Sequence, residues 1–109
     1  MRARPVVTLV LASSIIAGCA SFEAARLYRS GNRALDAGDS VSAVADLERA
    51  AQLVPHASEI QNHLGLAYAA AGRGDAAVAA FRRAVEIDCD NAAAQHNLEV
   101  AQQRAAEGP

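Results

Sequence analysis

Lysine and tryptophan are absent from the 109-residue chain, and aromatic residues make up only 4% of it. All of the ten basic residues are arginine, and they form no cluster beyond Arg82-Arg83. The formal net charge is −2. A nucleic-acid-binding surface needs a clustered excess of positive charge, so we expect no nucleic-acid partner. The length leaves room for one small domain.

Motifs of catalysis and metal binding are also missing. The chain has no G-x-S-x-G, no H-E-x-x-H and no glycine-rich phosphate-binding loop. No two of His56, His63 and His96 are spaced i, i+4, the spacing that places two metal ligands on one helix face. We therefore predict no catalytic site, no metal, no cofactor and no small-molecule substrate, and we interpret the histidines as surface or groove residues.

Alanine supplies much of the 52% hydrophobic content. It is the strongest helix former, and its small side chain lets helix axes approach closely. The three prolines lie outside the helical patterns, and no alternating pattern competes with them. The composition therefore predicts an all-α fold.

Residues 1–18 look like an export signal rather than part of the fold. Two arginines precede an apolar run from Val6 to Ala17, which is too short to span a bilayer as a stable helix. The run ends in Ile16-Ala17-Gly18-Cys19, which resembles the lipobox of bacterial lipoproteins.

The lipobox resemblance implies that Cys19 becomes the mature N-terminus and carries a lipid. Ala20 is not the Asp that tends to retain such proteins at the inner membrane, so the resemblance implies an outer-membrane lipid anchor with the domain facing the periplasm. Three alternatives stay open: a soluble periplasmic protein, an inner-membrane anchor and an uncleaved signal anchor.

Residues 19–23 are interpreted as the lipidated N-terminus and a short tether. If extended, the four residues after Cys19 reach about 14 Å, which would place the domain against the lipid headgroups. Phe22 has two possible roles here, in the membrane interface or as a cap on the first helix.

An internal repeat with a period of about 34 residues organises the rest of the chain. The matched pairs are Gly31 and Gly65, Gly38 and Gly72, Ala43 and Ala77, Leu47 and Phe81, Arg49 and Arg83, and Ala50 and Ala84. A fixed period of this length indicates a repeat protein.

The best-formed copy of the repeat contains Leu64, Gly65, Tyr68, Ala77, Phe81 and Ala84. Their spacing closely resembles the tetratricopeptide repeat, a helix-turn-helix unit of that length. The resemblance implies a solenoid of two full repeats, residues 24–57 and 58–91, followed by residues 92–109 as a solvating cap helix and partial third repeat.

The helix ends have sequence signals of their own. Asp39 or Ser40 can cap the second helix of the first repeat, and Pro55 follows its end. Ser58-x-x-Gln61 has the spacing of a capping box at the start of the second repeat.

In tetratricopeptide domains the first helix of each repeat lines a concave groove that binds a peptide or helix of a partner. Carried over by position, this groove contains Tyr28, Asn32, Leu35, Asp36, Asn62, Leu66, His96 and Val100. Tyr28 and the leucines have an alternative role in packing the helices together. Family members that clamp a carboxylate use lysines and an arginine at the positions of Tyr28, Ala93 and Asn97, so we do not expect that specificity.

Cys89 stands where the first repeat has Pro55. With Cys19 lipidated it is unpaired, which allows an intermolecular disulfide or a reactive thiol. The acidic neighbours Asp88 and Asp90 disfavour the thiolate, so we favour a tolerated substitution.

The leading functional hypothesis is a non-enzymatic scaffold of the bacterial cell envelope that binds an envelope protein. Small lipoproteins that it resembles serve pilus, secretin or outer-membrane assembly. The alternatives are a redox or metal-linked accessory role through Cys89 and the histidines, and a structural envelope lipoprotein that forms homo-oligomers.

Overall fold

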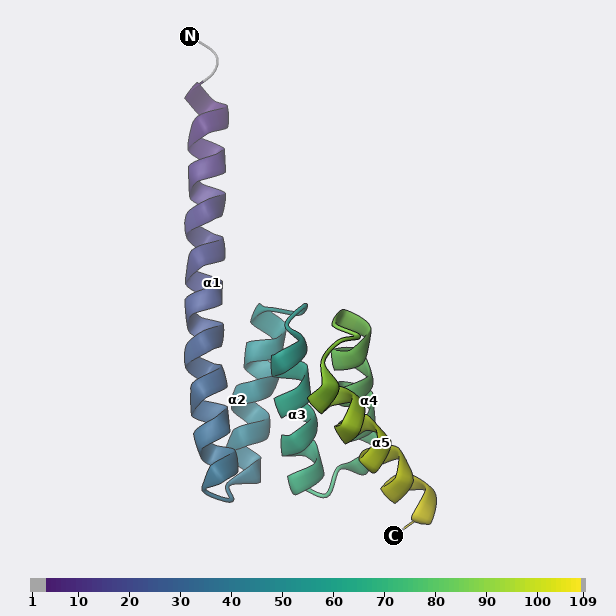
Figure 1. The fold of residues 1–109 in the computed structure, drawn as a ribbon. Helices are drawn as coiled ribbons and strands as arrows, with labels where there is room; N and C mark the ends of the chain where they lie inside the picture. The colour runs from purple at the N-terminus through teal and green to yellow at the C-terminus, as the bar shows by residue number, and fades with distance from the viewer. Residues whose placement is uncertain (1–3, 109) are drawn as a thin grey trace.

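The computed structural model describes the backbone of residues 4–108 and the side chains of residues 18–108. Five helices follow one another: α1 (Arg4–Asp36), α2 (Ser40–Leu53), α3 (Ser58–Ala70), α4 (Gly74–Ile87) and α5 (Ala92–Glu107) (Figure 1). No strand occurs over residues 4–108. The predicted all-α fold is confirmed.

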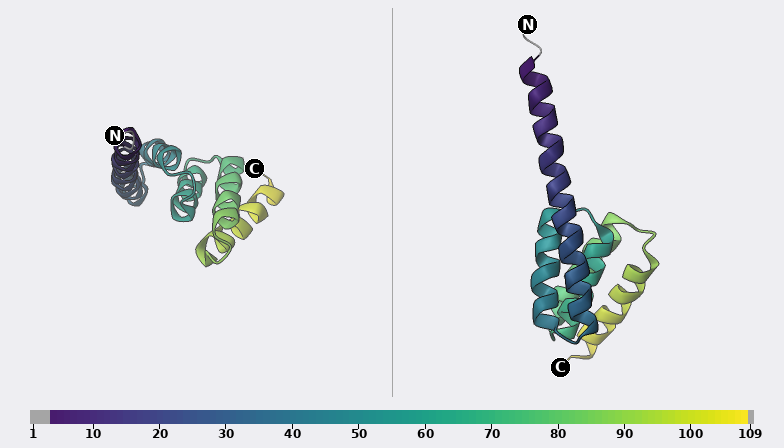
Figure 2. Two further views of the ribbon diagram at one scale, coloured as in Figure 1. Left: turned by 90° about the horizontal axis from the view of Figure 1, so that it is seen from above. Right: turned by 90° about the vertical axis from the view of Figure 1, so that its left-hand side faces the viewer.

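The helices form two antiparallel hairpins and one additional helix, arranged in a row. α1 lies against α2 and α3 against α4, and α5 closes the row (Figures 1 and 2). The N-terminal part of α1 projects well beyond the other helices (Figure 2), so the molecule is elongated, with extents of 68 × 28 × 19 Å.

The conformation expected for the tether is wrong. Residues 19–23 belong to α1, because Ala20, Glu23 and Ala24 favour a helix and no glycine or proline interrupts it there. The four residues after Cys19 therefore rise about 6 Å along the helix axis, less than half of the extended length.

Most side chains of the predicted signal segment, residues 1–18, are outside the part of the chain whose side chains are described. The cleavage of this segment stays a prediction. Phe22 lies within α1 and is 69% exposed, so it does not cap the helix. Among the residues described, no helix is both long enough and apolar enough to cross a membrane.

Each hairpin turns at a glycine with a left-handed backbone. Gly38 has φ 79° and Gly72, its counterpart in the next repeat, has φ 75°. The bonds around them match: Asp39 N–H donates to Ala34 O, and Arg73 N–H donates to Tyr68 O, both at 2.8 Å. This is the bond pattern of a helix that ends at glycine.

A second pair of glycines allows the two helices of each hairpin to approach closely. A methyl group added to Gly31 would lie 2.6 Å from Leu47 Cγ, and one added to Gly65 would overlap the Phe81 ring. Leu47 is fully buried and Phe81 is 2% exposed. The repeat therefore reproduces one steric fit, a bulky side chain of the second helix against a glycine of the first.

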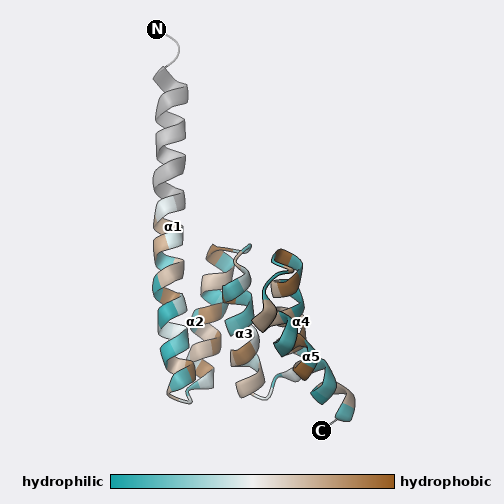
Figure 3. Cartoon of the chain, in the orientation of Figure 1, coloured by the Kyte–Doolittle hydropathy of each residue, from teal (hydrophilic) through white to brown (hydrophobic). Residues whose placement is uncertain are grey.

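Small residues complete the buried seam on both sides of this fit. Ala43 and Ala50 on α2 and Ala77 and Ala84 on α4 are at most 1% exposed. Because alanine adds no bulk beyond Cβ, it keeps the helices near contact distance. Figure 3 shows apolar and polar stretches alternating along the helices, with a hydrophilic end on α5.

The sequence predicted a side-chain cap at the start of α2, and the structure has one. The Asp39 carboxylate caps α2, accepting from Ser42 N–H at 3.1 Å. Hydrogen bonds from the Ser42 side chain and backbone lower the pKa of Asp39.

The capping box at Ser58 is wrong. Ala57 is the N-cap of α3, and no side chain caps this helix. Ser58 Oγ instead donates to Ala84 O at 2.9 Å and accepts from Asn91 Nδ2 at 2.8 Å. The serine thus joins the start of α3 to the end of α4 and to the loop before α5, a tertiary role that local spacing does not reveal.

A polar link joins the two hairpins. Tyr68 OH donates to Glu48 Oε1 at 2.9 Å, and Arg73 lies over the Tyr68 ring at 4.5 Å from its centre. Arg73 also pairs with Glu48 at 3.7 Å. Burial and the hydrogen bond to Glu48 raise the pKa of Tyr68.

α5 has the polar outer surface of a terminal helix. Glu99 and Gln102 occupy the positions that Gly65 and Tyr68 have in the second repeat, and both are exposed. With no following helix packed against it in the described chain, α5 needs no glycine there, and polar residues keep its free face in water.

We expect Gly65→Ala to destabilise the fold by about 1–3 kcal/mol, because the added methyl group must displace the Phe81 ring. Gly74→Ala is the matched control, since its new methyl group meets nothing within 4 Å. Urea unfolding of both variants measures the difference. In a Phe81→Leu background the cost of Gly65→Ala should shrink; an equal cost in both backgrounds would contradict the proposed fit.

Candidate functional site

The first helices of the three units present equivalent positions on one side of the molecule. Residues that occupy the same repeat position on α1, α3 and α5 form a row, and we distinguish three such rows. They contain Tyr28, Asn62 and His96; Asn32, Leu66 and Val100; and Asp36, Ala70 and Arg104. Most of the residues predicted to line the groove belong to these rows, and Leu35 stands next to Asp36.

A hollow lies between α1 and α3. It is lined by Asn32, Leu35, Asp36, His63 and Leu66 and has a volume of about 480 Å³. Four of these five residues were predicted from the family pattern, and His63 was not. The hollow combines two leucines with an amide, an imidazole and a carboxylate, so it can hold an apolar side chain beside polar backbone groups.

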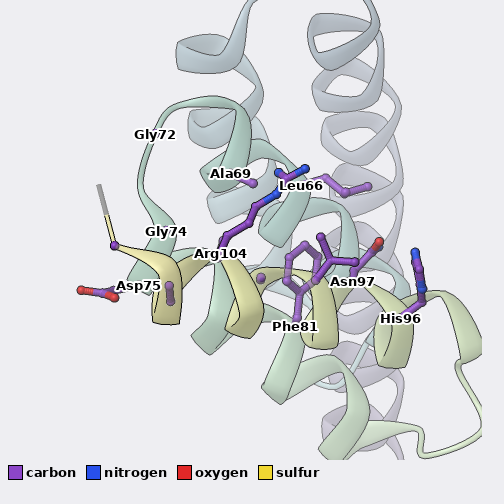
Figure 4. A pocket seen from close by; sticks show the side chains of 14 residues that line it. Leu66, Ala69, Gly72, Gly74, Asp75, Phe81, His96, Asn97 and Arg104 are labelled. Carbon is purple, nitrogen blue, oxygen red and sulfur yellow. The ribbon is translucent and has the colours of Figure 1, made fainter.

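A second and more apolar hollow opens between α3 and α5, with α4 as its floor. It has a volume of about 630 Å³, and Leu66, Phe81 and Val100 supply its large apolar side chains. Arg104 and His96 lie at its rim, where Figure 4 shows Arg104 extending from α5 toward Leu66 and Ala69. The Phe81 ring thus has two roles, filling the space at Gly65 and forming part of the wall of the hollow.

The third hollow is polar and lies at the N-terminal ends of α3 and α5. Its volume is about 720 Å³, and its acidic lining comes from Glu59, Asp88 and Asp90. Asn62 and Leu66 line it as well. Leu66 therefore lines all three hollows and marks the centre of the predicted groove.

Tyr28 and His63 form a contact between α1 and α3. Their rings meet edge to face with centres 5.1 Å apart. Tyr28 OH lies 3.2 Å from His63 Nδ1, which is also 2.9 Å from the backbone oxygen of Glu59. A protonated Nδ1 donates to the Glu59 carbonyl, and an unprotonated one accepts from Tyr28.

The environment of Tyr28 fits a packing residue better than a groove surface. Burial raises its pKa, a hydrogen bond from Asn32 opposes the rise, and the Glu59 charge adds to it. Tyr28 packs against both clusters of buried residues, and it is not among the residues that line the three hollows. Its hydroxyl instead holds the histidine that separates two of them.

The two amides in the rows, Asn32 and Asn62, differ in their contacts. Asn97 Nδ2 donates to Asn62 Oδ1 at 2.9 Å, and Asn62 is only 6% exposed. This bond ties α5 to α3. Asn32 Oδ1 is buried without a hydrogen-bond partner among the described residues. A buried carbonyl oxygen without a donor is costly, so this position is a local weak point of the α1 side.

Sequence reasoning missed His63 and Phe81 as residues of the hollows. His63 occupies the same repeat position as Asn97, and that equivalence was the available signal. Phe81 was interpreted as core alone, because a sequence pattern does not show that the space beside the ring opens toward α5.

Cys89 is exposed in the loop between α4 and α5, and Cys19 is exposed on α1. Gln95 Nε2 donates to the backbone oxygen of Cys89, which holds this loop against α5. His56 lies near Arg83, at 3.4 Å from its guanidinium, and takes no part in the His63 contact. Within the described residues, no three potential metal ligands gather.

Comparison with protein-family models matches residues 28–94 to the tetratricopeptide repeat. The match covers more than half of the chain and includes all of α2, α3 and α4. The chain therefore belongs to the tetratricopeptide-repeat family, as the sequence pattern predicted. No curated protein matches the chain. Tetratricopeptide domains are typically non-catalytic modules for protein–protein interaction, and this membership supports a protein partner.

Proposed function

We propose that the protein is a scaffold of the bacterial cell envelope that binds a segment of another envelope protein. The observation that carries this proposal is the position of Leu66, where three hollows meet on the side formed by the first helices of the repeats. A bound segment can place apolar side chains in the hollows on either side of Leu66 while its backbone meets the polar rim.

The surroundings of Leu66 suit a protein segment better than a small molecule. The hollows are partly open to solvent, and they succeed one another across α1, α3 and α5. Small-molecule sites usually enclose most of their ligand in one concave pocket. An extended or helical segment instead covers several adjacent depressions and gains its affinity from a few buried anchors.

The proposal also places the protein on the outer membrane, facing the periplasm, through a lipid on Cys19. The lipobox-like sequence before Cys19 supports this anchor, and so does the exposure of both Cys19 and Phe22 on α1. Phe22 lies one helical turn after Cys19 and is suited to the headgroup region. Because residues 19–23 are helical, the repeats would be held rigidly at a short distance from the lipid.

The lipid anchor predicts that Cys19→Ser abolishes labelling of the protein by a palmitate analogue and releases it from the outer-membrane fraction. Cys89→Ser is the matched control and should keep both label and location, because Cys89 lies in the α4–α5 loop. Equal labelling of wild type and Cys19→Ser would contradict the anchor. A labelled protein found only in the inner membrane would contradict the outer-membrane assignment.

If the groove binds the partner, the double variant Leu66→Ala/Val100→Ala should lose partner binding. Both side chains line the apolar hollow, and truncating buried anchors of an interface typically costs about 2 kcal/mol or more each. Affinity capture of the full chain from detergent-solubilised membranes, followed by mass spectrometry, measures the loss. Val41→Ala is the control, since Val41 is 78% exposed on α2 and lies outside the hollows. If the double variant and Val41→Ala capture the same proteins and both keep the wild-type thermal melt, the proposal that the groove binds a partner is contradicted.

A further inference from the structure

The two ends of the groove carry opposite charges at one repeat position. Asp36 on α1, Ala70 on α3 and Arg104 on α5 are equivalent residues of successive repeats. They occupy the same place near the C-terminal ends of three helices that run in the same general direction (Figure 1). A segment that crosses the groove from α1 to α5 therefore meets a carboxylate first, a neutral residue next and a guanidinium last.

Neither charged side chain is held by another residue. The side chains of Asp36 and Arg104 form no ion pair or hydrogen bond with any residue that the structure describes. Arg104 extends over the apolar hollow toward α3, whereas Asp75, the acidic residue on the rim of this hollow, points away from it (Figure 4). The guanidinium is thus available to a carboxylate that enters from outside.

Large apolar side chains lie between the two charges. Leu35 stands beside Asp36, Leu66 lies in the centre, and Val100 and Phe81 line the hollow that Arg104 covers. Such a surface binds a large apolar side chain by removing it from water. The volume of about 630 Å³ is ample for one.

The opposite edge of the groove restricts what else can bind. Glu59, Asp88 and Asp90 line the polar hollow at the N-terminal ends of α3 and α5. They repel a segment that is acidic throughout. A carboxylate on the partner is therefore tolerated near Arg104 and disfavoured elsewhere along the groove.

We infer that the groove selects an extended protein segment with a basic residue at one end, an apolar residue in the middle and an acidic residue at the other end. The basic residue lies at Asp36, the apolar side chain lies in the hollow over Phe81, and the carboxylate pairs with Arg104. This inference rests on the proposed function, in which the groove binds a protein segment. It adds the charge pattern that distinguishes one segment from another.

The probes are three fluorescein-labelled peptides of about nine residues, about 30 Å long when extended, with neutral termini and the same leucine-containing centre. One peptide ends in Arg and Asp, one in Arg at both ends and one in Asp at both ends. Fluorescence anisotropy with the full chain at low salt measures the affinities. The Arg/Asp peptide should bind up to about fivefold more tightly than either of the others, since each of the others lacks one exposed ion pair, worth up to about 1 kcal/mol.

Charge-reversal variants give the sharper test. Arg104→Asp leaves both groove ends acidic and should shift the preference to the Arg/Arg peptide. Asp36→Arg leaves both ends basic and should shift it to the Asp/Asp peptide. Arg82→Asp makes the same change in net charge as Arg104→Asp on an exposed residue of α4 that lines none of the hollows, and it should preserve the original order.

The outcomes separate the inference from the proposed function. Equal affinities for the three peptides, or an order that Arg82→Asp changes as much as Arg104→Asp, would overturn the charge pattern and leave groove binding intact. Binding of none of the peptides would also overturn it. The capture experiment with the Leu66 and Val100 variant decides separately whether the groove binds a protein at all.

Discussion

The close contact between a glycine on the first helix and a bulky side chain on the second is the constraint on which the rest of the structure depends. Leu47 fills the space at Gly31, and Phe81 fills the space at Gly65. A third contact of this kind does not occur in the described chain, because α5 has Glu99 at the equivalent position. The two contacts set the distance between the helices within each hairpin, and thereby the direction in which α1, α3 and α5 face.

The groove follows from this packing. Once the bulky residues of α2 and α4 point into their hairpins, the first helices are left with one uncovered side, which carries Leu66 at its centre. α5 contacts α3 and α4 but leaves an apolar hollow beside the Phe81 ring. The same aromatic side chain thus links the stability of the second hairpin to the proposed binding surface.

Much of the fold was predictable because the same packing residues occur in both repeats. The glycines at the turns, the glycines at the close contacts and the seam of alanines recur at the same repeat positions, so the α2, α3 and α4 helices follow from spacing. Seven of the eight predicted groove residues also line the hollows, and Tyr28 is the exception. Three features did not follow from spacing. Residues 19–23 became helical because local helix preference extends α1 past the repeat. Ser58 does not cap α3 but donates a hydrogen bond to Ala84 O, and Asn62 is buried and accepts a hydrogen bond from Asn97. The last two depend on contacts between distant residues.

The central claim is that a protein partner docks on the side of the molecule centred on Leu66. The most direct test replaces Leu66 with the photo-crosslinking residue p-benzoylphenylalanine and, in a second protein, replaces the 78% exposed Val41 of α2 in the same way. The account predicts that irradiation of membranes links a protein to the Leu66 position and leaves the Val41 position unlinked. A crosslink at Val41 with none at Leu66, or the same crosslinks at both, would contradict it.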